Sequence, residues 1–151
     1  MTSSTPRLVF LLNAAQRRLQ QLVTAEQLRL TTQALDAPTP AQGGLLFALH
    51  TLDGQTMGEL SLALDLAPSA VTGLVQRTES QGWVIRATGD QDGRTQRVWL
   101  QPAGRALIPH LRGALKRINS RITHGFTPEE LAVVGRWLGH VQQCGNPPET
   151  P

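Results

Sequence analysis

The apolar positions of this chain recur at helical spacing over most of its length and change to a strand-like pattern near its middle. Three- and four-residue spacing of apolar side chains predicts amphipathic helices over residues 6–33, 40–52, 102–124 and from 128 onward. Short apolar or alternating runs at 83–86 and 96–100 flank the turn-forming sequence ATGDQDGRT and predict a β-hairpin. The pattern therefore predicts a mainly α protein with a small β-element, an α+β fold.

Local start signals place two short helices directly before this hairpin. Thr56 is followed three residues later by Glu59, which is a capping box at the start of a helix. Pro68 suits the first turn of the next helix, which we expect to run to about Gln81 and to stop at Gly82. Two further capping boxes are expected at Thr39/Gln42 and Thr127/Glu130. Two helices, a sharp turn and a hairpin are the order of a winged helix-turn-helix, which places its second helix in the major groove of DNA.

The second of these helices, 68–81, has one apolar face and one polar face. The apolar face is predicted to consist of Val71, Leu74, Val75 and Thr78. The polar face offers groups that read base edges, with an arginine placed for a phosphate or a guanine: Ser69, Thr72, Gly73, Gln76 and Arg77. A glycine inside a helix costs about 1 kcal/mol relative to alanine, so close approach of DNA is one reason for its presence. The alternative is that these residues form the solvated face of an ordinary amphipathic helix.

Arginines and aspartates cluster on the predicted hairpin. Arg86, Arg94 and Arg97 lie on or beside the strands, and Asp92 precedes Arg94 by two residues. We expect all four residues to belong to the DNA-binding surface. An arginine at a hairpin tip can enter a minor groove, and a nearby carboxylate can orient its guanidinium. The alternative is a solvated hairpin with incidental arginines.

These motifs resemble the winged-helix core of the MarR family of bacterial transcriptional regulators. The recognition-helix pattern S-x-V-T-x-L-V-x-R-x-E-x-x-G is present in residues 69–82, and the wing pattern D-x-R is present in residues 92–94. The resemblance implies that Arg94 contacts the minor groove with Asp92 as its partner. It also implies a small aromatic or anionic effector bound between the dimerisation helices and the winged helix. Gln101 and Thr78 depart from the family pattern, at a helix cap and at a packing position normally filled by leucine.

The terminal helices carry apolar seams suited to a two-fold dimer. We therefore expect one domain, residues 1–151, with dimerisation helices at 6–33 and 102–143. Residues 39–100 would form the DNA-binding core, and residues 144–151 a flexible tail. A homodimer would bind a pseudo-palindromic operator with half-sites about one helical turn apart.

Composition narrows the function. Residues 34–66 hold four acidic and no basic residues, whereas residues 68–121 hold nine of the fourteen basic residues, an asymmetry typical of a phosphate-binding half. No apolar run is long enough to span a bilayer, and no secretory signal is evident, so we expect a cytoplasmic protein without a membrane partner. The four histidines and single cysteine have no metal-ligand spacing, and no nucleophile or phosphate loop is recognisable. We expect no metal, no cofactor and no enzyme activity.

The leading hypothesis is a dimeric, sequence-specific regulator bound to double-stranded DNA, most simply a repressor relieved by an effector. Arg17, His50 and Trp99 are candidates for the effector pocket. Two alternatives remain open at this point. One is a winged-helix module for protein–protein interaction or scaffolding, and the other is a redox-sensing variant that uses Cys144.

Overall fold

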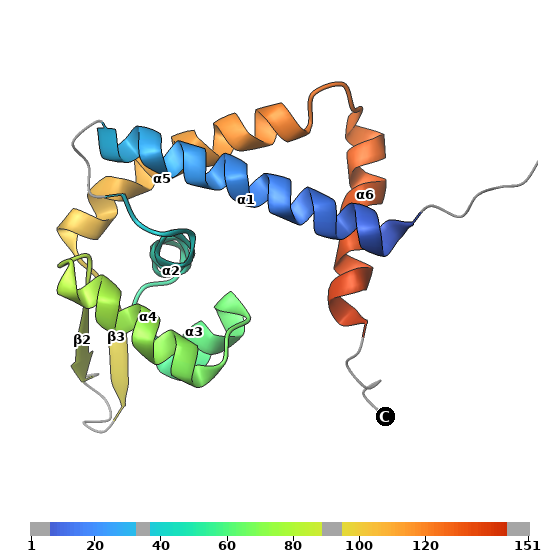
Figure 1. Ribbon diagram of the computed structural model, residues 1–151. Helices are drawn as coiled ribbons and strands as arrows, with labels where there is room; N and C mark the ends of the chain where they lie inside the picture. Colours follow the sequence, from blue (N-terminus) through green and yellow to red (C-terminus); the bar gives the residue numbers. More distant parts are fainter. Residues whose placement is uncertain (1–6, 33–36, 89–94, 145–151) are drawn as a thin grey trace, which may run out of the picture. The chain divides into compact units, whose positions relative to one another are not determined.

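The computed structural model describes residues 7–32, 37–88 and 95–144 of the chain. Within them lie six helices and three strands (Figure 1). In chain order these are α1 (Leu8–Thr32), α2 (Pro40–Thr51), β1 (Gln55–Thr56), α3 (Met57–Leu64), α4 (Pro68–Ser80), β2 (Val84–Thr88), β3 (Gln96–Leu100), α5 (Pro102–Ile122) and α6 (Pro128–Gln143). The chain forms two compact units, residues 1–115 and 116–151. The expected mainly helical fold with a small β-wing is confirmed.

The strands form one antiparallel sheet in the order β1–β3–β2. β2 and β3 pair along their whole length, from Val84 opposite Leu100 to Thr88 opposite Gln96. β1 adds two residues on the other side of β3, with Gln55 opposite Val98. The sequence around Gln55, between two predicted helices, allows a short third strand against the wing, and the sheet confirms this strand.

The three capping boxes form as predicted within the described residues. At α3 the Thr56 hydroxyl accepts the Glu59 N–H at 3.2 Å, while the Glu59 carboxylate accepts the Thr56 N–H at 2.7 Å. Thr39 with Gln42 and Thr127 with Glu130 repeat the arrangement at α2 and α6. Each box satisfies two backbone donors that a helix start leaves unpaired. The starts of these helices are therefore specified locally by the sequence.

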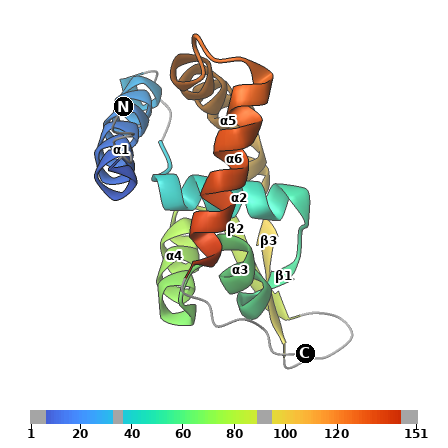
Figure 2. The ribbon, with the colours of Figure 1, turned by 90° about the vertical axis from the view of Figure 1, so that its right-hand side faces the viewer.

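The core of the first unit lies where α2, α3, α4, the sheet and the first half of α5 meet. Its largest fully buried side chains include Leu45, Leu46, Leu49, Leu60, Val71, Val75 and Val98. Figures 1 and 2 show α3, α4 and the strands gathered on one side of α2. This packing fixes the recognition-helix candidate α4 against both α2 and β2.

The helical spacing of Leu45, Leu46 and Leu49 continues to Leu52 and predicts that all four are buried. For Leu52 this prediction is wrong, because its side chain is 64% exposed. The helix ends at Thr51, and Leu52 is its C-cap with an extended backbone (φ −141°, ψ 107°). The change of backbone conformation carries the side chain away from the apolar face of α2.

The second unit contains the end of α5 and all of α6. None of the 16 residues of α6, all of them described, is buried. The predicted helix to about His124 ends at Ile122, and α6 begins at Pro128 as expected. In the part of the chain that the structure describes, no helix combines the length and apolar character needed to cross a bilayer.

Candidate nucleic-acid interface

The two faces of α4 are oriented as the sequence predicts. Its buried residues are Val71, Leu74, Val75 and Thr78, all at 2% exposure or less. The side chains of Ser69, Thr72, Gln76 and Arg77 are exposed, and Gly73 is half-buried. Thr78, where the resemblance expects a leucine, packs fully buried because its hydroxyl donates to the Leu74 carbonyl at 2.8 Å. The helix therefore buries its apolar face and presents its hydrogen-bonding face to solvent.

A tight turn sets α4 at its angle to α3. Asp65 ends α3 in the left-handed conformation (φ 51°), and the Leu66 N–H donates to the Ser61 carbonyl at 3.1 Å. The N-cap of α4 is Ala67, and among the described residues no side chain caps this helix start. The first amides of α4 lie at an exposed helix N-terminus, a place that favours a phosphate because the helix dipole and free N–H groups point toward it.

Two residues of the polar face of α4, Thr72 and Gly73, have features that affect contacts with another molecule. The Thr72 hydroxyl donates to the Pro68 carbonyl at 3.0 Å, which leaves its lone pairs able to accept a hydrogen bond. A Cβ added to Gly73 would meet the Arg77 Nη1 at 3.2 Å and reach nothing else among the described atoms within 4 Å. Because Gly73 has no side chain, the surface of α4 beside the Arg77 guanidinium carries no Cβ that would keep another molecule away from the helix backbone.

Arg86 of β2 is joined to α4 rather than extended into solvent. Its Nε and Nη2 lie 2.8 and 2.7 Å from Oε2 of Glu79, and its backbone N–H donates to Oε1 at 2.9 Å. These hydrogen bonds, first from the Arg86 side chain and then from its backbone, lower the pKa of Glu79. Arg86 was predicted to contact DNA, and the structure places its guanidinium on a carboxylate of the recognition helix.

Arg97 of β3 lies at the junction with β1 and α3. Its Nη1 donates to the Gly54 carbonyl at 2.7 Å and lies 3.8 Å from Oε2 of Glu59. The backbone and side-chain hydrogen bonds of Thr56 lower the pKa of Glu59, with a smaller contribution from the Arg97 charge. Arg97 too was predicted to contact DNA, and its guanidinium is engaged within the fold.

The Asp53 carboxylate connects three parts of the winged helix, which no sequence motif indicated. Its Oδ1 accepts the Leu100 N–H at 2.8 Å and the Gly54 N–H at 3.1 Å, and its Oδ2 accepts from the Arg105 guanidinium. One carboxylate thereby joins the end of α2, the end of the wing strand β3 and the first turn of α5. Leu100 and Arg105 are 47 and 52 residues away from Asp53 in the chain, so no local sequence pattern indicates these two contacts.

The predicted tip residues Asp92 and Arg94 lie outside the described residues. The last described pair of the hairpin, Thr88 opposite Gln96, leads directly into that segment. Figure 2 shows α4 and the strands on the same side of α2. At the end of α4 the Trp83 N–H donates to the Thr78 carbonyl at 3.3 Å, so the helix passes into β2 through a hydrogen-bonded turn.

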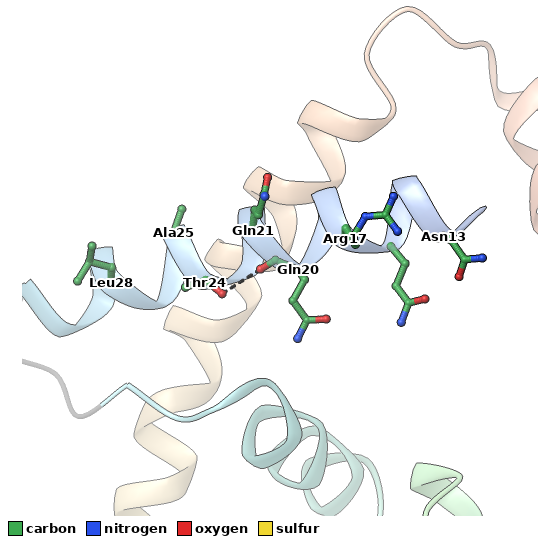
Figure 3. Close-up of a pocket in the computed structure, with 8 residues that line it drawn as sticks. Asn13, Arg17, Gln20, Gln21, Thr24, Ala25 and Leu28 are labelled. Carbon is green, nitrogen blue, oxygen red and sulfur yellow. Dashed lines mark hydrogen bonds between the residues drawn. The ribbon is translucent and has the colours of Figure 1, made fainter. Parts of the chain in front are cut away.

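The three candidates for the effector pocket are not brought together. Arg17 lines a hollow of about 680 Å³ along α1, together with Asn13, Gln20, Thr24 and other residues of that helix (Figure 3). Among the described residues its lining includes neither His50 nor Trp99. The Trp99 ring instead covers Gly54, where an added Cβ would lie 2.5 Å from it. His50 is exposed in the last turn of α2, and Cys144 is exposed at the end of α6.

A helix-turn-helix whose second helix exposes a polar face beside an antiparallel hairpin defines a winged helix-turn-helix DNA-binding protein. The sequence pattern of the MarR family matches residues 38–95. The chain is 32% identical over 106 residues to the uncharacterized HTH-type transcriptional regulator YsmB of Bacillus subtilis. The aligned region covers 70% of this chain and 73% of that relative. The chain belongs to the MarR family of transcriptional regulators, which are non-enzymatic DNA-binding proteins.

Solved structures show the same fold. A MarR family protein from Bacillus stearothermophilus is 30% identical, with a TM-score of 0.65 over 90% of this chain and 91% of that one. Bordetella bronchiseptica BpsR gives a TM-score of 0.80 at 20% identity, covering 94% of this chain and 96% of that one. S. aureus MepR, solved with DNA, gives a TM-score of 0.78 at 18% identity, covering 92% of this chain and 98% of that one.

Proposed function

We propose that this chain is a homodimeric regulator that binds a pseudo-palindromic operator through α4 and is released from it by a small effector. The observation that carries the proposal is the division of α4 into a buried apolar face and an exposed hydrogen-bonding face. MepR has been solved as a DNA complex and a MarR variant from E. coli with operator DNA, which supports the same mode of binding here.

Four exposed side chains of α4 suit contacts with DNA. Ser69 and Gln76 would read base edges in the major groove as donors or acceptors, and Thr72, whose hydroxyl proton is held by the Pro68 carbonyl, would accept a hydrogen bond. Arg77 would contact a phosphate or a guanine. Asp92 and Arg94 of the hairpin tip remain a prediction from the sequence, with the arginine in the adjacent minor groove.

Exposed apolar side chains support the dimer. On α1, Val9, Phe10 and Leu11 are between 54 and 76% exposed, and Leu8 and Leu19 of the predicted seam are about 40% exposed. On α6, Val133, Val134 and Leu138 are exposed as well. Most of the stability of a helix in a protein comes from packing of its apolar face, and exposed apolar patches rimmed by polar residues mark interfaces. A second copy of the chain would cover both sets of side chains.

The effector is proposed to be a small aromatic anion. BpsR is regulated in its DNA binding by 6-hydroxynicotinic acid, a ligand of this chemical class. In this chain Arg17, Asn13 and Gln20 line the hollow along α1 (Figure 3). A carboxylate would be recognised by the arginine, and the amides would bind polar ring substituents. Loss of operator affinity in the presence of such an acid, abolished by Arg17→Gln, is the expected behaviour.

Selection of bound fragments from the source genome tests the proposal. We expect recovery of fragments that share a two-fold symmetric motif, with binding that weakens steeply as salt rises because phosphate contacts release counterions. Arg77→Gln should reduce affinity and, with Arg77 on a phosphate, make the log–log slope of affinity against salt shallower by about 1.8, because the dimer loses one phosphate contact in each half-site. Random recovery, or affinity indifferent to salt and to Arg77→Gln, would instead favour the protein-interaction module.

A further inference from the structure

The two described arginines of the wing strands both point back to the helices instead of away from the fold. Arg86 on β2 meets Glu79 in the last turn of α4, and Arg97 on β3 meets the Gly54 carbonyl and Glu59 at the start of α3. Each arginine therefore joins one strand of the hairpin to one helix of the helix-turn-helix. These contacts take up part of the donor capacity of each guanidinium and hold it toward the helices.

The Glu79–Arg86 contact is the stronger of the two. Both carboxylate oxygens of Glu79 are used: Oε2 by two guanidinium nitrogens and Oε1 by the backbone N–H of Arg86. The side chains are 27 and 33% exposed, so solvent screens the pair only in part. The backbone hydrogen bond fixes the strand itself, and the side-chain bonds fix its direction. This combination sets the angle between β2 and α4.

The second contact uses a residue that is already committed to a cap. Oε2 of Glu59 accepts the Thr56 N–H at 2.7 Å and faces Arg97 Nη1 at 3.8 Å. Thr56 lies opposite Arg97 in the β1–β3 register, so the same short segment begins α3 and borders β3. The Gly54 carbonyl holds the guanidinium at 2.7 Å from the other side. β3 is thereby fixed to the start of the helix-turn-helix.

We propose that Arg86 and Arg97 are positioning residues that hold the wing at a fixed angle to the recognition helix, and that neither contacts DNA directly. The inference rests on the proposed function, because the angle matters only if α4 and the hairpin bind the same duplex. Specific recognition needs both elements in register with adjacent grooves, and a pre-set angle removes the cost of ordering the wing on binding. The sequence-based assignment of both arginines to DNA contact is replaced by this role.

Glu79→Gln separates the two roles because it leaves the Arg86 cation in place. If Arg86 contacts DNA, releasing it from a carboxylate and removing a negative charge should leave operator affinity unchanged or tighter. If Arg86 positions the wing, Glu79→Gln should weaken operator binding by about tenfold, equivalent to about 1.4 kcal/mol. The log–log salt slope should stay at the wild-type value, because the number of neutralised phosphates is the same.

Arg86→Gln and the double variant complete the test. Under the proposal Arg86→Gln weakens binding by a factor similar to that of Glu79→Gln, with no change in salt slope, and the double variant is no weaker than either single one. Arg77→Gln on the exposed face of α4 is the matched control, with a slope shallower by about 1.8 because one phosphate contact is lost in each half-site. A shallower slope for Arg86→Gln, or wild-type affinity for Glu79→Gln, would overturn the proposal.

Two further measurements exclude a merely structural effect. Affinities are measured well below the thermal transition of each variant, where a residue that only stabilises the fold would leave the affinity of folded protein at the wild-type value. Arg86→Lys keeps the charge but loses the contact through two nitrogens. We therefore expect weaker operator binding, whereas a simple phosphate contact would be largely retained.

Glu59→Gln preserves the cap, since glutamine also serves there, and should weaken operator binding less than Glu79→Gln. If Arg77→Gln also has no effect, the proposed function itself fails.

Discussion

Two glycines in helices show how differently the same residue type can be required. At Gly104 in the first turn of α5, an added Cβ would lie 2.3 Å from the Trp83 carbonyl oxygen and 2.9 Å from Leu100. The first of these atoms is backbone, so the helix or the strand would have to move. At Gly73 in α4 the only described atom near such a Cβ is the end of the Arg77 side chain, at 3.2 Å. The fold requires the first glycine and tolerates a side chain at the second.

Gly104→Ala should therefore destabilise the protein by about 1–3 kcal/mol, the usual cost of inserting a group into a packed site. The free energy of unfolding from denaturant titration measures the change. Gly58→Ala is a useful control because an added Cβ there meets no described atom within 4 Å. Equal stability of the Gly104→Ala and Gly58→Ala variants would show that α5 does not pack on Trp83 as observed.

Gly73→Ala should have the opposite effect on stability. Alanine is favoured over glycine inside a helix by up to about 1 kcal/mol, and the added Cβ would require only the end of the flexible Arg77 side chain, 3.2 Å away, to shift slightly. We expect the variant to unfold at the same or a higher denaturant concentration while its operator affinity falls, because the methyl group would lie between α4 and the DNA. A stabilised variant with unchanged affinity would show that DNA does not approach this part of the helix.

At the scale of elements, the connections between helices and wing carry the geometry of the site. The Arg86 hydrogen bonds lower the pKa of Glu79 below its ordinary value. A carboxylate with a depressed folded-state pKa adds stability above its unfolded pKa, about 4.3, and that stability is lost as the pH falls through the folded value. The α4–β2 connection is thus expected to weaken in acid and to be at full strength at neutral pH.

Comparison of the wild-type protein with Glu79→Gln at several pH values tests this expectation. The wild type should be the more stable of the two at pH 7, and the difference should shrink as the pH falls below about 4. Urea unfolding at each pH gives the two free energies, and their difference cancels the titration of other carboxylates. A difference that stays constant from pH 7 to pH 3 would mean that Glu79 gains nothing from Arg86.

The sequence predicted the elements well where the signals are local. Capping boxes and the i, i+3, i+4 face of α4 depend on residues a few positions apart, and both formed as expected. The burial of Leu52 was wrong, because the spacing continues past the point where the helix stops. The partners of Arg86, Arg97 and Asp53 could not be predicted. The sequence pattern of an arginine on a strand is the same whether its side chain faces DNA or a carboxylate of another element. The Asp53 contacts with Leu100 and Arg105 join residues 47 and 52 positions apart, beyond the reach of any local pattern.

At the scale of the whole molecule, α1 and α6 expose apolar side chains that the second copy of the chain would cover in the proposed dimer. Leu138→Glu places a charge on the apolar side of α6, where Val134 is exposed as well. We expect this variant to sediment as a monomer and to lose operator affinity, because two half-sites must be held together. Gln142→Glu, at an exposed polar position of the same helix, is the matched control and should remain dimeric. A Leu138→Glu variant that stays dimeric would place the interface elsewhere.

Hydroxyl-radical footprinting on a selected operator can show whether α4 and the wing bind one duplex from each half of a symmetric dimer. We predict two protected patches centred about one helical turn apart, related by two-fold symmetry, each with flanking protection in the minor groove. Arg77→Gln should weaken both patches together. A single asymmetric patch, or uniform protection without a sequence boundary, would contradict this prediction.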